Sequence, residues 1–375
     1  MDPVEVQNFF APIDMEWHKE ARRRFASPFL GTRHGHIPVD PMMLSHAAVV
    51  SGRTIREFYE NPELGAHCVA SVQELYDLLP VTHWYFSLVW LSELGMETQY
   101  MDLMPPVPKA PVILDPSQAD ELHVPGPEDL LKGWTINQLF RANDYVEKNI
   151  PYMFTPLAIA SDLTGSAAQL CGLENFIMWT ITEPDVAHKL VRTYMETAAN
   201  GAEVIANRYG SAAITTGSVL GNNDIFSDDM VRDFSAKYLN EFVLKCFEKG
   251  AGPQVFYHLC GNHCTDFKVL KEHMIWSPMT IVHVGYKDRE VFPADLLIKE
   301  FGDLATCMGT VDTKLMVSGT PKRIYEQARD QLIRGRDCPS GFILGTACEV
   351  PALTPPNNIM ALNKAAQDFG TYGTW

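Results

Sequence analysis

From about residue 153 onward, short apolar runs alternate with longer amphipathic stretches. The apolar runs have the length of strands, and the amphipathic stretches repeat their apolar residues at helical spacing. The expected strands are 157–160, 213–216, 255–259, 280–284, 305–308 and 342–344. The helices expected after them are 166–180, 227–249, and four that begin near residues 265, 293, 320 and 354. Strand–helix units in series predict parallel strands joined by right-handed crossovers.

The expected helix starts carry local signals. Ser227 precedes Asp228 and Asp229, and a Thr-Pro pair stands at 320 and again at 354. A hydroxyl can cap the first turn, proline suits the first helical position, and early carboxylates interact well with the helix dipole. These signals support the helix positions inferred from the hydrophobic pattern.

The first 110 residues are less regular. Helical patterns at 55–59 and 66–79 alternate with proline-bearing connectors, and 105–108 and 115–117 are expected to be loop. We therefore expect an α/β protein with one barrel domain over residues 1–375, a (β/α)8 TIM barrel with an N-terminal helical elaboration. An open doubly wound sheet is the alternative. It is less favoured because no Gly-rich dinucleotide fingerprint follows any expected strand.

Composition narrows the function classes. The formal net charge is −16, which makes nucleic acid an unsuitable partner because phosphate binding requires concentrated Lys and Arg. We expect no membrane span, since polar residues interrupt every apolar run, and no secretory signal is readable at the N-terminus. A cytoplasmic location is therefore expected. The eight cysteines then indicate buried thiols or metal ligands rather than disulfides.

Two expected strands end in soft metal ligands. His258 and Cys260 close the 255–259 run, and Cys348 follows the 342–344 run. The C-terminal ends of parallel barrel strands share one rim, so these residues can converge on one ion. One imidazole and two thiolates form a three-ligand zinc site with an open fourth position, as catalytic zinc requires. The alternative for the H-x-C pair is a satisfied histidine beside a buried thiol.

The neighbouring residues leave further alternatives open. Cys264 competes for a ligand role, although we expect His263 and Cys264 at the entrance of the next helix, as packing or as support for the ligands. Glu349 can approach the metal or remain a solvated carboxylate. The other cysteines are expected to be core or surface thiols: Cys68, Cys171, Cys246, Cys307 and Cys338.

Other polar residues lie at or near the expected strand ends. Their place on this rim favours a substrate pocket over a structural role, although each alone is also compatible with a structural role. The candidates for substrate binding are Asp162, Asn222, Asn223, Asp224, Tyr257, His283 and Asp312.

At these residues the chain resembles the uroporphyrinogen decarboxylase superfamily. Within it, the chain is most similar to the zinc-dependent corrinoid methyltransferases, such as methylcobalamin:coenzyme M methyltransferase and related corrinoid-linked demethylases. The matching stretches are 156–160 with Gly165, 258–262, 341–348 and 351–359. The resemblance extends over roughly residues 35 to 370. It implies that His258, Cys260 and Cys348 bind zinc and act through it.

The chain departs from the decarboxylase branch near its N-terminus. There the decarboxylases carry arginines that bind the carboxylates of the substrate, whereas residues 37–46 contain none. The resemblance therefore implies methyl transfer between a small molecule and the cobalt of a corrinoid, carried by a separate protein that docks on the rim. A decarboxylase, which needs no metal, is the alternative. A non-catalytic barrel with Cys264 as a fourth zinc ligand is a third reading.

The sequence leaves the substrate open between a thiol and a methyl donor such as a methoxylated aromatic ring. Aromatic and methionine side chains can line an apolar pocket for such a ring or belong to the helix core; they are Trp84, Phe86, Trp90, Met101 and Met104. The direction of transfer and the fourth zinc ligand are also open. A homodimer is compatible with the sequence.

Overall fold

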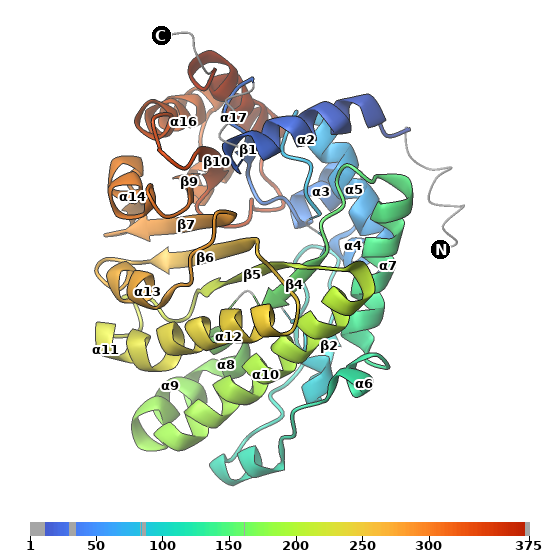
Figure 1. The fold of residues 1–375 in the computed structure, drawn as a ribbon, viewed down its shortest axis with the longest axis vertical. Coiled ribbons are helices and arrows are strands. Elements are labelled where there is room, and N and C mark those ends of the chain that lie inside the picture. The colour runs from blue at the N-terminus through green and yellow to red at the C-terminus, as the bar shows by residue number, and fades with distance from the viewer. Residues whose placement is uncertain (1–11, 30–34, 83, 85–87, 161, 372–375) are drawn as a thin grey trace.

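A curled parallel sheet forms the centre of the molecule. The structure, a computed structural model, describes residues 12–29, 35–82, 84, 88–160 and 162–371. The parallel strands follow the spatial order β1-β10-β9-β7-β6-β5-β4 (Figure 1). Their bounds are β1 Val39–Asp40, β4 Leu157–Ala160, β5 Ala213–Ser218, β6 Val255–Asn262, β7 Thr280–Lys287, β9 Thr306–Val311 and β10 Phe342–Thr346. A short strand, β8 (Glu290–Val291), pairs with β7 in the antiparallel direction.

The segment 79–82 joins the two ends of this sheet. The amide of Leu79 donates to the carbonyl of Val39 in β1 at 2.9 Å. The hydroxyl of Thr82 donates to the carbonyl of Met153, shortly before β4, at 3.0 Å. The sheet is therefore closed on itself, as a barrel of parallel strands requires, and the predicted (β/α)8 architecture is confirmed. The open doubly wound sheet is not the fold.

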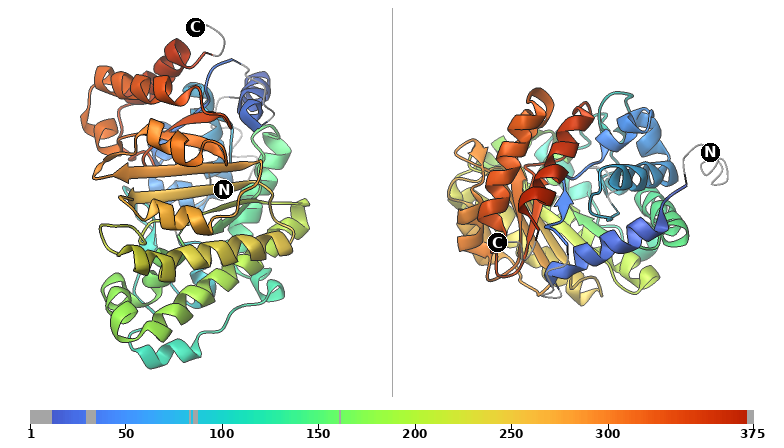
Figure 2. Two further views of the ribbon diagram at one scale, coloured as in Figure 1. Left: turned by 60° about the vertical axis from the view of Figure 1, so that its left-hand side comes forward. Right: turned by 90° about the horizontal axis from the view of Figure 1, so that it is seen from above.

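Helices follow the strands along the chain and cover the outside of the sheet (Figure 2). Their bounds are α8 Leu163–Cys171, α9 Leu173–Thr182, α10 Pro184–Tyr209, α11 Asp228–Val231, α12 Lys237–Glu248, α13 Phe267–His273, α14 Ala294–Phe301, α15 Thr313–Ser318, α16 Pro321–Gly335 and α17 Pro356–Phe369. A π-helical turn, Arg232–Ala236, links α11 to α12. In the part of the chain that the structure describes, no helix is long and apolar enough to cross a bilayer.

Three details differ from the sequence-based expectations. The helix expected at 166–180 is divided at Gly172, whose φ of 85° ends α8 and begins α9. The hydrophobic pattern did not reveal the 26 residues of α10. Thr354 does not cap α17, because Pro355 occupies the N-cap position and Thr354 is buried. The expected caps at Ser227 and Thr320 are confirmed, since each hydroxyl accepts a backbone amide.

The N-terminal part forms the expected helical elaboration. It comprises α2 Met15–Phe29, α3 Ser45–Val50, α4 Ile55–Glu60, α5 Pro62–Leu75, η1 Ser92–Leu94, α6 Pro127–Leu130 and α7 Trp134–Asn149. The two connectors expected to be loop contain short elements instead. Val107–Pro108 is strand β3, paired with β2 (Thr98–Gln99), and Pro116–Glu121 is the 3-10 helix η2. The prolines interrupt long elements here but still allow short ones.

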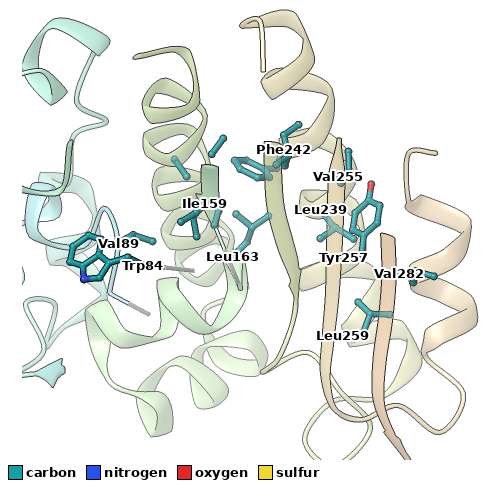
Figure 3. Packing of buried hydrophobic residues seen from close by; sticks show 14 of the residues in the cluster. Trp84, Val89, Ile159, Leu163, Leu239, Phe242, Val255, Tyr257, Leu259 and Val282 are labelled. Atoms are coloured by element: carbon teal, nitrogen blue, oxygen red, sulfur yellow. The ribbon is translucent and has the colours of Figure 1, made fainter. Parts of the chain in front are cut away.

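Apolar side chains fill the space on both faces of the sheet. One layer packs between strands and helices and includes Ile159, Leu239, Phe242 and Val282 (Figure 3). A second, smaller layer contains Phe25, Met42, Leu79, Ile281, Met308 and Ile343. Together these layers hold the strand ends in fixed positions, as a site built from several strands requires.

The aromatic residues considered for a substrate pocket belong mostly to the core. Trp84 and Trp90 are fully buried, and their indole nitrogens donate to the carbonyls of Phe58 and Ile159 at 3.0 and 2.7 Å. Of the remaining members of that group, Met101 is partly buried and Met104 is exposed. Phe86 lies outside the described residues. The two tryptophans therefore belong to the core, which was one of the two alternatives for this group.

Candidate metal centre

Strand β6 separates its side chains into two sets. Tyr257 and Leu259 pack on the helix side, as Figure 3 shows, so the alternating residues His258 and Cys260 lie on the opposite face. The pairing register with β7 shifts between Leu259 and Asn262. At this point Gly261 has a φ of 101°, which glycine adopts without strain. The H-x-C spacing therefore brings an imidazole and a thiol to one face just before the strand bends.

Cys348 completes a cluster with these two residues. It lies two residues beyond the end of β10, and one donor atom from each of His258, Cys260 and Cys348 lies within 4.8 Å of the other two. The Sγ atom of Cys348 is 3.7 Å from Nε2 of His258. In a tetrahedral zinc site, typical bond lengths separate a sulfur and a nitrogen ligand by about 3.6 Å. The donor types and their spacing therefore fit zinc.

Glycines on the adjacent strands make room for this cluster. Gly217 in β5 pairs with His258, and a Cβ atom at position 217 would lie 1.8 Å from the His258 carbonyl oxygen. Gly285 in β7 is also closely packed, since a Cβ atom there would lie 2.7 Å from the carbonyl oxygen of Ala347. Any larger residue would push the ligand-bearing segments apart. The two glycines thus allow the close approach that the cluster needs.

The two thiols influence each other directly. A hydrogen bond between them raises the pKa of Cys260 and lowers that of Cys348, while burial acts against both thiolates. His258 also favours the thiolate form of Cys348. Cys348 is therefore the thiol that ionises more readily, and a bound cation would favour the thiolate form of both sulfurs.

His283 of β7 contacts both parts of the cluster. Its ring stacks on that of His258, with centroids 4.7 Å apart and planes inclined by 16°. Its Nε2 donates to the carbonyl of Thr346 at 3.0 Å, two residues before Cys348. Burial, with a contribution from His258, lowers the pKa of His283, so the ring is neutral at pH 7. His283 was expected to bind substrate, and in the structure it contacts the two segments that carry the candidate ligands.

A buried histidine–carboxylate pair holds the backbone carbonyl of Cys260 in place. His263 and Asp266 are both fully buried, with Nδ1 and Oδ2 2.8 Å apart. The other ring nitrogen of His263 donates to the carbonyl of Cys260 at 3.1 Å. His263 thus lies at the helix entrance, as expected, whereas Asp266 was not identified from the sequence. His263 precedes α13 and Asp266 is its N-cap residue, so no helical spacing rule indicated this pair.

Cys264 does not belong to the cluster. Its Sγ donates to Oδ1 of Asn262 at 3.5 Å, and the cluster found among the described residues contains only one histidine and two cysteines. Glu349 is also directed elsewhere, because its carboxylate accepts the amide of Ser45 at 3.0 Å. The five cysteines expected to be ordinary thiols are buried and free: Cys68, Cys171, Cys246, Cys307 and Cys338.

Asn222, Asn223 and Asp224 connect loops at the rim. Oδ1 of Asn223 accepts the amides of Thr265 and Asp266 at 2.8 and 3.1 Å, which ties the loop after β5 to the start of α13. Oδ1 of Asn222 accepts the amide of Asp224 at 2.8 Å. The carboxylate of Asp224 in turn accepts the side chain of Asn262 at 2.9 Å. The three candidates therefore lie together near Cys260 and brace the loops there.

Asp312 and Tyr257, two further candidates for substrate binding, form hydrogen bonds within the protein. Asp312 caps α15 by accepting the amide of Lys314 at 2.9 Å, and it also accepts the hydroxyl of Tyr286 at 3.0 Å. Tyr257 lies on the helix side of β6, and its hydroxyl bonds to both the amide and the carbonyl of Ile275. The expectation that Tyr257 contacts substrate is therefore corrected, because side chains alternate along a strand.

Asp162 follows β4 and is 7% exposed. Its Oδ2 accepts the amide of Leu220 at 2.7 Å, which connects the ends of β4 and β5. Gly165 allows this arrangement, since a Cβ atom there would lie 2.2 Å from Oδ2. Burial raises the pKa of Asp162, and the surrounding backbone amides oppose the rise. Asp162 also lines a cavity at this edge of the barrel.

Known proteins share this fold and are related to this chain in sequence. The family model of uroporphyrinogen decarboxylase (URO-D) matches residues 20–369. A methylated-thiol–coenzyme M methyltransferase from Methanosarcina mazei is 25% identical over 267 residues, which span 70% of this chain and 66% of that protein. The solved structure of a methyltransferase from Methanosarcina mazei superposes with a TM-score of 0.75 at 19% identity, covering 93% of this chain and 98% of that one. The chain is therefore a member of the uroporphyrinogen decarboxylase family.

Proposed function

We propose that this protein is a zinc-dependent methyltransferase that moves a methyl group between a small molecule and the cobalt of a corrinoid. The observation that carries the proposal is the convergence of His258, Cys260 and Cys348 at the rim of the barrel. Three ligands leave one coordination position for a substrate, which distinguishes catalytic zinc from structural zinc. The name of the Methanosarcina mazei relative, a methyltransferase that acts on methylated thiols, supports the same chemistry.

Zinc bound at these residues would lower the pKa of a coordinated thiol or polarise an ether oxygen, so that a nucleophile or leaving group forms near neutral pH. The protein residues prepare the ligands for this role. His283 fixes the plane of the His258 ring and the backbone before Cys348, and His263 fixes the carbonyl of Cys260. Such supporting contacts keep metal ligands oriented and strengthen metal binding.

The corrinoid is proposed to come from a separate protein. Its binding surface would be the rim that carries His258 and Cys348, because the transferred methyl group must reach cobalt from the open metal position. The small-molecule substrate would enter from the same rim and is either a methyl donor or a thiol acceptor. All eight cysteines are free thiols, which suits a reducing compartment, and we therefore propose a cytoplasmic location.

The alternative within this family is decarboxylation of a tetrapyrrole. A substrate with many carboxylates needs a cluster of cationic side chains, and residues 37–46 carry no arginine or lysine. The non-catalytic alternative, a structural metal site, needs a fourth protein ligand. Cys264 was the candidate for that ligand, and its thiol bonds to Asn262 instead. Both alternatives therefore have less support than methyl transfer.

Zinc content tests the proposal. We expect about one zinc per chain in purified protein, and Cys348→Ala should lose most of it while remaining folded, because a rim ligand is not part of the core. Cys264→Ser is the matched control, since this thiol lies nearby but outside the cluster. Full zinc retention by the Ala variants of His258, Cys260 and Cys348 would overturn the assignment.

A further inference from the structure

A cavity of about 400 Å³ lies between α8 and the segment 219–225 that follows β5. This volume falls within the range of small-molecule sites. Leucine, isoleucine, valine and alanine side chains form most of the wall, and two of them, Leu173 and Ile225, are 50% and 41% exposed at its edge. The described lining residues are Asp162, Gly165, Ser166, Ala168, Gln169, Leu173, Val219, Leu220 and Ile225.

Asp162 is the one ionisable side chain among these described lining residues. One of its oxygens, Oδ2, is held by the amide of Leu220. The other, Oδ1, is buried without a hydrogen-bond partner in the described part of the chain. Transferring a carboxylate from water into an apolar wall is costly unless a partner compensates for the lost hydration. The backbone amides of Thr164, Gly165 and Val219 offset part of this cost, and a ligand that carries positive charge would offset more of it and favour the ionised carboxylate.

The cavity is close to the proposed metal centre. Asn222 belongs to the same 219–225 segment, and its side chain packs against Gly261, the residue after Cys260. The carboxylate of Asp162 also acts electrostatically on the Cys260 thiol, as a smaller contribution beside that of Cys348 and burial. The segment that lines this cavity thus also contacts the backbone next to Cys260.

We propose that this cavity selects a small, positively charged substrate, such as a methylated ammonium or sulfonium compound, with Asp162 as the group that recognises the charge. The inference rests on the proposed methyltransferase function and specifies its substrate class. Methyl groups around a cationic centre match the apolar wall, and the carboxylate matches the charge. An anionic substrate would meet the buried carboxylate of Asp162 and be repelled.

A series of three compounds of similar shape tests this charge selection. Choline, the neutral 3,3-dimethylbutan-1-ol and the anionic 3,3-dimethylbutanoate are titrated separately into the full-length protein, with binding measured by calorimetry. We expect choline to bind at least about tenfold more tightly than the neutral compound, and the anion to bind most weakly. Asp162→Asn keeps an acceptor for the Leu220 amide and should reduce the preference for choline to within about twofold of the neutral compound.

Glu174→Gln serves as the control, because Glu174 is an exposed carboxylate beside the lining residue Leu173. This variant should keep the preference for choline. The inference is overturned if the wild type prefers the neutral or anionic compound, if it binds none of the three at millimolar concentration, or if Asp162→Asn retains the preference. These titrations require neither methyl transfer nor a corrinoid. Failure of the proposed reaction with intact choline selectivity would therefore count against the function alone.

Discussion

His283 stacks on His258 with ring centroids 4.7 Å apart, and the same ring donates a hydrogen bond to Thr346, two residues before Cys348. One side chain thus contacts the two segments that carry the proposed metal ligands. These segments are separated by 90 residues between His258 and Cys348, so their relative position depends on contacts of this kind. His283 is a positioning residue rather than a ligand in this account.

Replacing His283 by leucine should weaken zinc binding. The variant loses the stacking contact and leaves the Thr346 carbonyl without its donor, so we expect zinc affinity to fall by about tenfold or more. Competition with a chromophoric chelator at neutral pH measures this change. Tyr257→Phe is the control, because that side chain lies on the opposite face of β6, and it should bind zinc like the wild type. Equal affinity in His283→Leu and the wild type would contradict the positioning role.

Gly217 should tolerate no side chain. A methyl group at this position would lie 1.8 Å from the carbonyl oxygen of His258, which is backbone and cannot move aside without displacing β6. We expect Gly217→Ala to lower the free energy of unfolding by about 3 kcal/mol and to reduce zinc content. Gly126→Ala is the matched change, since its nearest contact would be an ordinary 3.8 Å. Gly126→Ala should lower the free energy of unfolding, measured with urea, by less than about 1 kcal/mol. Similar effects of the two changes would refute this explanation.

Stability should depend on the protonation of buried His67. Burial lowers its pKa to about 4, whereas an unfolded histidine titrates near about 6.5. Between these values the unfolded state binds a proton that the folded state does not. The contribution of neutral His67 to the free energy of unfolding is therefore complete above about pH 6.5. It is lost by about 1.4 kcal/mol per pH unit as the pH falls toward about 4.

His67→Gln should reduce the pH dependence of the free energy of unfolding by about 1.4 kcal/mol per pH unit between about pH 6.5 and pH 4.5. Urea unfolding at several pH values measures the slope for each variant. His123→Gln, a change at an exposed histidine, should leave the slope as in the wild type. An unchanged slope in His67→Gln would show that this histidine does not contribute.

The barrel was predictable because its second half repeats one simple pattern. Each apolar run from Leu157 to Leu344 forms a parallel strand, and oxygen caps at Ser227 and Thr320 mark helix starts. The 26-residue α10 was missed although Pro184 and Asp185 in its first turn and Gly210 at its C-cap mark its ends, because it follows α9 directly with no strand between them. The cap at Thr354 was misassigned for a different reason, because a Thr-Pro pair indicates a local preference that tertiary contacts can override.

The candidate site could be predicted only as far as residue types and strand ends indicate it. His258, Cys260 and Cys348 were identified from residue type and strand ends, and the structure brings them together. Tyr257 was misassigned because alternation along the strand turns it toward the helices. Asp266 was missed because its role depends on a contact with His263 that no spacing rule requires. Contacts between distant loops, such as Asn223 with Thr265, likewise depend on the folded structure.

Methyl transfer to or from a corrinoid tests the central claim most directly. Zinc-loaded protein is mixed with methylcobalamin and a panel of thiols, and the corrinoid spectrum is followed over time. We predict that at least one thiol demethylates the corrinoid at a rate that requires the protein, and that Cys260→Ala abolishes this rate because zinc is no longer held. An equal rate with Cys260→Ala, or decarboxylation of uroporphyrinogen by metal-stripped protein, would contradict the account.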